Sequence, residues 1–413
     1  MREKDSRLFY GWWIVIGGFI LHFIGIGIGI NAIGVFFKPV VESLGFTRGD
    51  FSLYFTISAL SMMLAAPFIG KLLEKLDVRI VMGVSTALLA AGFALFSQCR
   101  TLTHFYLVAV IVGVGHAGSH IIPVSMMINN WFVKRRGMAM GIVFSATGLG
   151  GLVFNPVANW LVLNYGWEQT YIILGALIGL FCVPTALLIM RRTPEEMGLL
   201  PDGAAAKTRE ATGSAAGYTL GQSVKLPIFW MLAGMILFLN ALNMGIQQHL
   251  IPYLTDLGHS PTFAANIMAV YLGMTIAGKL VLGRISDREG VVRGYVVFCV
   301  VLGVGIGILF GAQIAWLAVL FGVVYGFANA IQTVVPPLMT ADGLGLKHYA
   351  LIYGVMNIFS TLGAGIGMPL SGYIYDATGS YGYAFVLYIV LTAAAMVLGI
   401  LAMRRAKFAR EKA

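Results

Sequence analysis

Residues 262–283 of this chain read TFAANIMAVYLGMTIAGKLVLG, an apolar run that contains a single charged residue, Lys279. The run is long enough to cross a lipid bilayer as a helix, because a crossing requires about 20 apolar residues. A charge inside such a segment is costly and by default marks a functional site, here one suited to an anion. A second interpretation stays open: Lys279 lies only one helical turn before Gly283, so its long side chain could reach the membrane surface instead.

Composition places the whole chain in a membrane. Of its 413 residues, 59% are hydrophobic and only 11% are charged, whereas a soluble protein carries about 25% charged residues. The net charge of +10 would suit nucleic acid, but the placement of the charges explains it better. We therefore expect a lipid bilayer as the partner and no nucleic acid.

Several kinds of chemistry lack their usual sequence signals. The motifs GxSxG, HExxH and GxxxxGK[ST] do not occur, which argues against an intramembrane enzyme and against an ATP-driven pump. The three cysteines, Cys99, Cys182 and Cys299, have no metal-ligand spacing. The expectation is a protein that is not an enzyme and that needs no cofactor and no metal.

Hydropathy predicts an all-α membrane protein with twelve transmembrane helices. They are expected near residues 11–37, 51–73, 79–98, 103–128, 137–163, 168–190, 226–254, 262–286, 292–312, 315–339, 349–374 and 381–403. A polar stretch, 191–225, interrupts them and is typical of a linker. It separates two six-helix halves, residues 1–190 and 226–413.

Basic residues give the orientation. If both termini are cytoplasmic, nearly all of the 27 lysines and arginines fall on the cytoplasmic side. Only Lys38, Arg48 and Arg100 lie on the other side, and Lys279 lies in a span. The positive-inside rule therefore predicts a multi-pass protein of the inner (cytoplasmic) membrane with both termini inside the cell. We expect it to be a monomer.

The two halves repeat at a fixed offset. The segment Gly70-Lys-Leu-Leu-Glu74 recurs 213 residues later as Gly283-Arg-Ile-Ser-Asp287. The same offset relates Gly141 to Gly354, Gly150 to Gly363 and Pro156 to Pro369. Repeated six-helix halves are typical of transporters that rock around a central site.

This pattern resembles the major facilitator superfamily. Its loop signature, G-x-L-x-D-R-x-G-R-K in idealised form, is matched by Gly283-Arg-Ile-Ser-Asp287-Arg288-Glu-Gly290-Val-Val-Arg293. The resemblance implies a latch between the halves at the cytoplasmic end, although ordinary charge that sets topology would also explain these residues. The latch candidates are Glu74, Arg79, Asp287, Arg288, Lys134 and Arg135.

Other motifs are similar to the monocarboxylate transporter and oxalate:formate antiporter branch, including its bacterial members. They are Phe9-Tyr10-Gly11-Trp12-Trp13, Trp131-Phe132-Val-Lys134-Arg135-Arg136 and Pro194-Glu195-Glu196-Met197-Gly198. Where that branch carries further charged groups, this chain has Asn31, Thr275 and Ser360. The resemblance thus leaves Lys279 as one intramembrane cation, which favours a monocarboxylate over a dianion. The missing acid at Thr275 puts the proton relay of the animal transporters in doubt.

Polar residues at helical spacing predict a central cavity. Asn240, Asn243 and Gln247 share one helix face, and Tyr325, Asn329 and Gln332 share another. Such faces line either a cavity or a contact between helices. The substrate-binding candidates are Lys279, Asn31, Ile28, His120, Asn243, Gln247, Thr275, Tyr325, Asn329, Asn357 and Phe359.

Histidines are the candidates for proton coupling, because their unperturbed pKa is about 6.5. His116 and His120 are four residues apart, and His249 lies near the end of another span. His22 is expected to be structural. A proton could instead cross together with a substrate carboxylate.

The sequence therefore predicts a secondary active transporter that works by alternating access. The first hypothesis is symport of a small, lactate- or pyruvate-like monocarboxylate with a proton. Exchange of organic anions, or transport of a neutral or drug-like solute, is the alternative.

Overall fold

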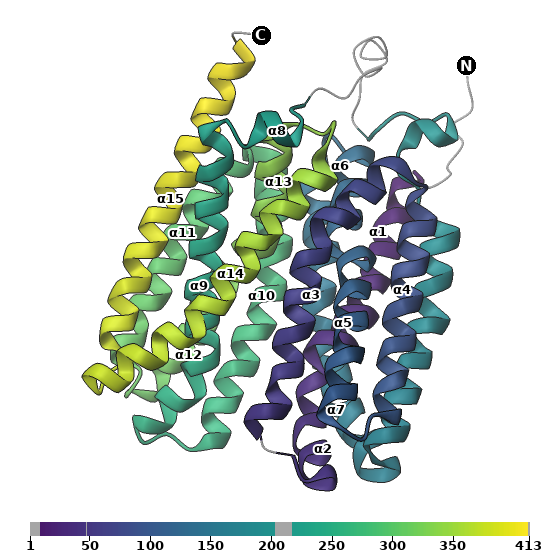
Figure 1. Cartoon of the computed structure of the whole chain (residues 1–413). Coiled ribbons are helices and arrows are strands. Elements are labelled where there is room, and N and C mark those ends of the chain that lie inside the picture. The colour runs from purple at the N-terminus through teal and green to yellow at the C-terminus, as the bar shows by residue number, and fades with distance from the viewer. Residues whose placement is uncertain (1–8, 47, 203–216, 412–413) are drawn as a thin grey trace.

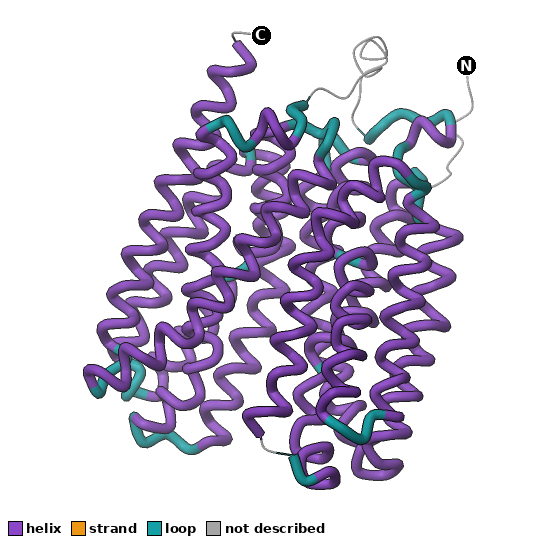
Figure 2. Tube along the Cα trace, viewed as in Figure 1, coloured by secondary structure: helices purple, strands orange, loops and turns teal. Residues whose placement is uncertain are grey.

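The computed structural model of the protein describes residues 9–46, 48–202 and 217–411, and within these ranges it contains helices and no strand (Figure 2). The first half contains α1 (Gly11–Ile20), the π-helix η1 (Leu21–Asn31), α2 (Phe37–Leu44), α3 (Arg48–Lys75), α4 (Val78–Leu95), α5 (Leu102–Ser119), α6 (Ile121–Trp131) and α7 (Arg136–Leu177). The second contains α9 (Pro227–Asp256), α10 (Pro261–Glu289), α11 (Val291–Ile308), α12 (Ala315–Ala328), α13 (Ile331–Leu344), α14 (Tyr349–Thr378) and α15 (Gly382–Glu411).

Eleven helices in the described part of the chain are long and apolar enough to cross a membrane. One of them, Arg136–Ile189, is 54 residues long and contains two of the predicted spans. Gly166 separates the two, because its φ of 80° and ψ of 166° interrupt the helix at a conformation that glycine tolerates. The twelve predicted crossings are thus all present.

Many large apolar side chains on the outer faces are exposed, as expected of surfaces in contact with lipid. On α3, Leu64 and Phe68 are 63% and 70% exposed, and on α7 Leu163 is 75% exposed. A water-soluble protein would bury such residues. Helices suit this environment because they satisfy their own backbone hydrogen bonds.

Two predicted spans are broken within their length. His120, with φ −128° and ψ −91°, separates α5 from α6. In the other half α12 ends at Ala328 and α13 begins at Ile331, which leaves Asn329 between them. Each break thus has a polar residue at it, His120 in one half and Asn329 in the other.

The halves meet at the end of the molecule where α1 begins and α15 ends, the upper end in Figure 1, which we call the linker end. There α7 packs on α10 and α3 packs on α14. Glycines allow the approach: a Cβ on Gly70 would lie 2.6 Å from the carbonyl oxygen of Ala350, and a Cβ on Gly283 would clash with that of Gly137. These two contacts are related by the 213-residue repeat, so the closure is pseudo-symmetric.

The linker itself lies partly outside the described residues, since 203–216 are not among them. Its described ends contain a short 3₁₀-helix, Pro194–Met197, and the one-turn helix α8 (Leu220–Ser223). Thr219 and Gln222 form a capping box that starts α8.

Candidate functional site

Lys279 lies between the two halves and points away from the linker end. Its side chain is only 4% exposed. The Nζ atom donates hydrogen bonds to the carbonyl oxygen of Phe144 and to Oγ1 of Thr147, each at 2.9 Å. Both acceptors lie farther along α7 from the linker end than Gly141, which faces the backbone of Lys279 itself. The lysine therefore does not reach the membrane surface here, and a binding role is favoured over the snorkelling alternative.

A cavity of about 420 Å³ lies next to this lysine, between α7 and α10. Its polar lining includes Asn31 from η1 and Gln247 from α9. Asn31 donates a hydrogen bond of 2.7 Å to the carbonyl oxygen of Thr147, the residue whose hydroxyl accepts from Lys279. Ile276, one helical turn from Lys279, also lines the cavity. The lysine thus sits just beyond the cavity lining.

Tyr271 joins the polar residues of the C-terminal half into one network. Its hydroxyl donates to Oδ1 of Asn243 at 2.9 Å and accepts from Nδ2 of Asn329 at 2.9 Å. Oε1 of Gln247 lies 3.4 Å from the same hydroxyl, and the ring of Tyr325 lies tilted against that of Tyr271, with 5.5 Å between the centroids. The sequence analysis missed Tyr271, although it lies on the Lys279 face of α10, eight residues before the lysine.

The remaining substrate candidates have different surroundings. Thr275 bonds to its own helix, through Oγ1 to the carbonyl oxygen of Tyr271 at 2.9 Å, and Ile28 is fully buried. Asn357 accepts a bond from Thr361 through its backbone oxygen. Phe359 packs against Phe229 and Trp230 at the linker-side start of α9 and is not among the residues that line the cavity. Its position on α14 turns it toward these two rings, and its assignment to the substrate site stays a prediction.

Three histidines form a buried cluster in the N-terminal half. The ring centroid of His120 lies 5.9 Å from that of His22 and 5.5 Å from that of His116. His22 bonds to the carbonyl oxygen of Gly18 at 2.8 Å and His116 to that of Gly29 at 3.2 Å. Each of the three rings keeps one nitrogen without a hydrogen-bond partner in the described part of the chain.

His22 also packs edge-on against Phe144, at 5.2 Å between ring centroids. Phe144 is the residue whose carbonyl accepts from Lys279. The histidine cluster therefore adjoins the lysine through one residue of α7. His249 lies elsewhere and bonds through Nδ1 to the hydroxyl of Tyr381 at 3.1 Å.

Asp287 forms a contact between the halves at the linker end. Its carboxylate accepts hydrogen bonds from the backbone amides of Gly137 at 2.5 Å and Met138 at 2.7 Å. These amides belong to the first turn of α7, where a helix has free N–H groups and a partial positive charge. Arg136, in the same turn, forms an ion pair with Asp342 of α13.

A second contact between the halves, which the repeat relates to that of Asp287, involves different chemical groups. Glu74 on α3 bonds through Oε1 to Nδ1 of His348 at 3.0 Å, just before α14 begins. Glu74 and Asp287 are equivalent by the repeat, and each reaches the start of a helix in the opposite half. The sequence analysis missed Arg136, Asp342 and His348, because nothing local marks residues that meet only when the halves close.

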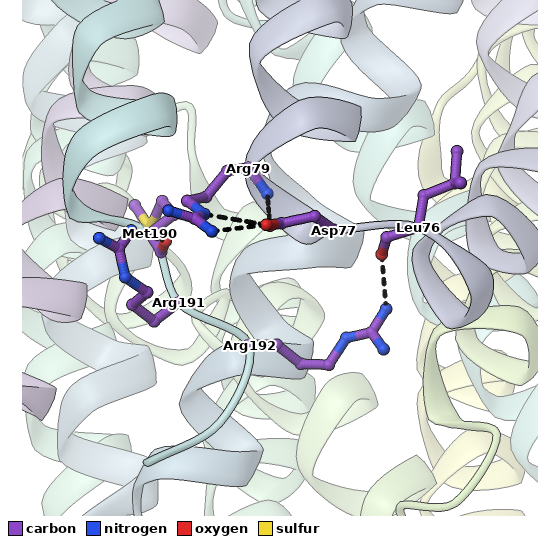
Figure 3. Close-up of polar contacts among 6 residues, drawn as sticks. All are labelled: Leu76, Asp77, Arg79, Met190, Arg191 and Arg192. Carbon is purple, nitrogen blue, oxygen red and sulfur yellow. Dashed lines mark hydrogen bonds and ion pairs between the residues drawn. The ribbon is translucent and has the colours of Figure 1, made fainter. Parts of the chain in front are cut away.

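The other latch candidates contact their own half or the linker. Arg79 pairs with Asp77, with a shortest distance of 2.6 Å between Nη2 and Oδ2 (Figure 3). Arg135 lies 4.0 Å from the carboxylate of Asp202 in the linker. In this conformation each of the two arginines has an acid of its own half or of the linker nearby, and their part in a latch stays a prediction. Two candidates line hollows at this end and form no ion pair with a described residue, Lys134 and Arg288.

The fold and this site define a multi-pass membrane protein with a cavity between its two helical halves, to which both halves contribute polar side chains. A family model described as the Major Facilitator Superfamily matches residues 16–250 and 233–413. The chain belongs to this superfamily and is a membrane transporter.

Named relatives agree with this assignment. The chain is 26% identical over 384 residues to monocarboxylate transporter 13 of Rattus norvegicus, covering 92% of this chain and 85% of the relative. It is 30% identical over 322 residues to an uncharacterised transporter of the same superfamily, YhjX of Escherichia coli, covering 76% of this chain and 75% of the relative. Among solved structures, the fucose:proton symporter FucP of E. coli superposes with a TM-score of 0.69 at 16% identity, covering 94% of this chain and 99% of that chain.

Proposed function

We propose that the protein is a secondary active transporter of a small monocarboxylate that works by alternating access. The observation that carries this proposal is the buried ammonium of Lys279 beside a cavity between the halves. Its two partners are a carbonyl and a hydroxyl, which carry no charge, so a substrate carboxylate would be its first anionic partner. The names of the monocarboxylate transporter relatives support this substrate class.

The binding step follows from the contacts of Lys279. A carboxylate that enters the cavity competes with Phe144 and Thr147 for the ammonium, and unlike them it adds the attraction between opposite charges, which is stronger in a buried site than in water. Because Phe144 and Thr147 lie in the opposite half, their release weakens a contact between the halves. Substrate binding is thereby coupled to the rocking movement.

We propose that the structure represents the outward-facing state. The contacts between halves gather at the linker end, which carries most of the basic residues and which we take to be cytoplasmic in an inner membrane. Asp287, Glu74 and their partners then close the inner gate. We place the chain in the monocarboxylate and oxalate:formate branch and expect it to act as a monomer.

Proton coupling is assigned to the buried histidines. His120 and His116 have ring nitrogens free to accept a proton, and their cluster adjoins Lys279 through Phe144. His249 is the weaker candidate, since it bonds to Tyr381 away from this cluster. Symport predicts that uptake increases with an inward proton gradient and that His120→Gln abolishes this increase.

Uptake by the purified protein in liposomes tests the proposal. A panel of short, branched and aromatic monocarboxylates is compared with oxalate and with neutral solutes, with and without a proton gradient. Lys279→Gln should raise the KM for a transported monocarboxylate at least tenfold, since truncating one partner of a buried charge pair costs about 2–5 kcal/mol. The exposed Lys71→Gln on α3 is the matched control and should transport normally.

Wild-type uptake by Lys279→Gln would refute the role of the lysine. Uptake that depends on a counter-anion and ignores the proton gradient would identify an exchanger instead. Transport of neutral solutes with no competition by monocarboxylates would favour the remaining alternative.

A further inference from the structure

Each half has a hollow at the linker end, and the two are related by the repeat. The N-terminal hollow has a volume of about 420 Å³ and the C-terminal hollow about 800 Å³. Six of the eight residues that line the N-terminal hollow recur 213 residues later in the lining of the C-terminal one, among them Lys75 as Arg288, Asp77 as Gly290 and Arg191 as Arg404. Both hollows thus lie between a loop that joins two spans and the end of the last helix of the half.

The N-terminal hollow contains its own anion. The carboxylate of Asp77 accepts hydrogen bonds from the backbone amide of Arg79 at 2.9 Å and from its guanidinium at 2.6–3.2 Å (Figure 3). This guanidinium holds the pKa of Asp77 below its usual value, and Arg191 contributes in the same direction. Glu196 lines the same hollow. Of the four basic residues in this lining, Arg79 is thus paired with an acid of the same hollow.

The C-terminal hollow lacks this internal ion pair, because both of its members are replaced, and it has Glu289 where the other half has Leu76. Gly290 and Val292 stand where the other half has Asp77 and Arg79. Gly290 has φ 89° and ψ 149°, a conformation that strongly favours glycine, so this loop cannot easily carry an aspartate there.

Three arginines line the C-terminal hollow, and none forms an ion pair with a described residue: Arg288, Arg293 and Arg404. Of the two acids in the lining, Asp342 is already paired with Arg136. The other acid of the lining is Glu289, which is next to Arg288 in the sequence.

The deeper wall of the C-terminal hollow is apolar. It consists of Val296 of α11 and Ile400 and Met403 of α15, two helices that pack side by side. Neighbouring residues on both helices face outward, with Val297 52% and Leu401 40% exposed. The hollow therefore joins a basic rim to a surface that contacts lipid chains.

We propose that the C-terminal hollow binds the headgroup of an anionic phospholipid, with its phosphodiester at the three arginines and its acyl chains along α11 and α15. The guanidinium of arginine suits phosphate oxygens because it offers paired donors. Basic hollows at the membrane surface are typical sites for anionic lipids. The apolar wall favours a lipid over a free phosphate ester. The inference does not depend on which solute is transported.

Native mass spectrometry of the full chain, released from micelles that contain equal amounts of phosphatidylglycerol and phosphatidylcholine, tests the proposal. The wild-type protein should retain phosphatidylglycerol preferentially. The double variant Arg288→Gln/Arg404→Gln should retain it at least tenfold less. Val292→Asp, which returns a carboxylate to the hollow, should have the same effect without removing an arginine.

Arg405→Gln is the matched control, since this exposed arginine neighbours Arg404 on α15 but does not line the hollow. It should bind as the wild type does. Equal loss in Arg405→Gln, or equal retention of both lipids by the wild type, would overturn the proposal. Competition by soluble glycerol phosphate at matched concentration would show a site for free phosphate esters and would overturn the choice of a lipid.

Discussion

The contact between Asp287 and α7 gives the sharpest prediction about the conformational equilibrium. The carboxylate accepts two backbone hydrogen bonds, at 2.5 and 2.7 Å, across the boundary between the halves. A hydrogen bond to a charged group contributes about 1.5–3 kcal/mol, and an acid at a helix N-terminus adds about 0.3–2 kcal/mol. Asp287→Asn keeps the shape and one acceptor oxygen but loses the charge. We therefore expect the closed state to lose about 2 kcal/mol, given these contributions.

A loss of this size shifts the ratio of closed to open molecules about 30-fold, because about 1.4 kcal/mol corresponds to a factor of ten. Spin labels at Lys71 and Lys347, which are exposed at the linker end of opposite halves, would report the change as a longer distance by pulsed electron resonance. The native cysteines would not interfere, since Cys99, Cys182 and Cys299 are buried.

Asp77→Asn is the matched control. Asp77 also caps a helix and accepts several hydrogen bonds, but all of them come from its own half. Its substitution should leave the distance distribution unchanged. If Asp287→Asn also left the distribution unchanged, the contact with α7 would not hold the halves together and the assignment of the gate would be wrong.

Three further predictions concern packing, the hydrogen bonds of buried polar groups, and pH. Gly283→Ala should prevent closure at the linker end, because the new methyl would clash with the backbone of α7, whereas Gly303→Ala, which has open space around it, should close normally in the same distance measurement. Tyr271→Phe should lower stability by about 1–3 kcal/mol by leaving buried amides unpaired, while Tyr325→Phe, whose hydroxyl has no partner among the described residues, should have little effect on thermal unfolding. Asp77→Ala should cost about 0.5–2 kcal/mol through loss of a helix cap. Because the neighbouring arginine depresses the pKa of Asp77, that difference should persist at neutral pH and disappear only as the pH falls below about 4 in thermal unfolding.

Most of the fold could be predicted from the sequence because the information is local. Each span is a long apolar segment, and the repeat of Gly70 and Glu74 as Gly283 and Asp287 is visible without a structure. The breaks at His120 and Asn329 were not visible, since an apolar helix and a broken one have similar composition. Here tertiary packing, which the local sequence does not report, determines the backbone.

Only part of the candidate site could be predicted from the sequence, for a related reason. Lys279 could be found because a charge in an apolar run is conspicuous. One of its partners is a backbone carbonyl, that of Phe144, which has no sequence signal at all. Tyr271 could have been found from its helical spacing with Thr275 and Lys279, but a tyrosine in a membrane span attracts less notice than an amide.

The repeat also bears on the proposed preference for a monocarboxylate. Gly354 approaches Ala66 as Gly141 approaches Lys279, so Ala66 is the counterpart of the lysine in space as well as in sequence. Duplication therefore provides two equivalent positions at the interface between the halves, and only one of them has a charge. A substrate bound at Lys279 would interact unequally with the two halves. Such a one-sided contact suits a molecule with a single carboxylate, because a second carboxylate would find no cation at Ala66.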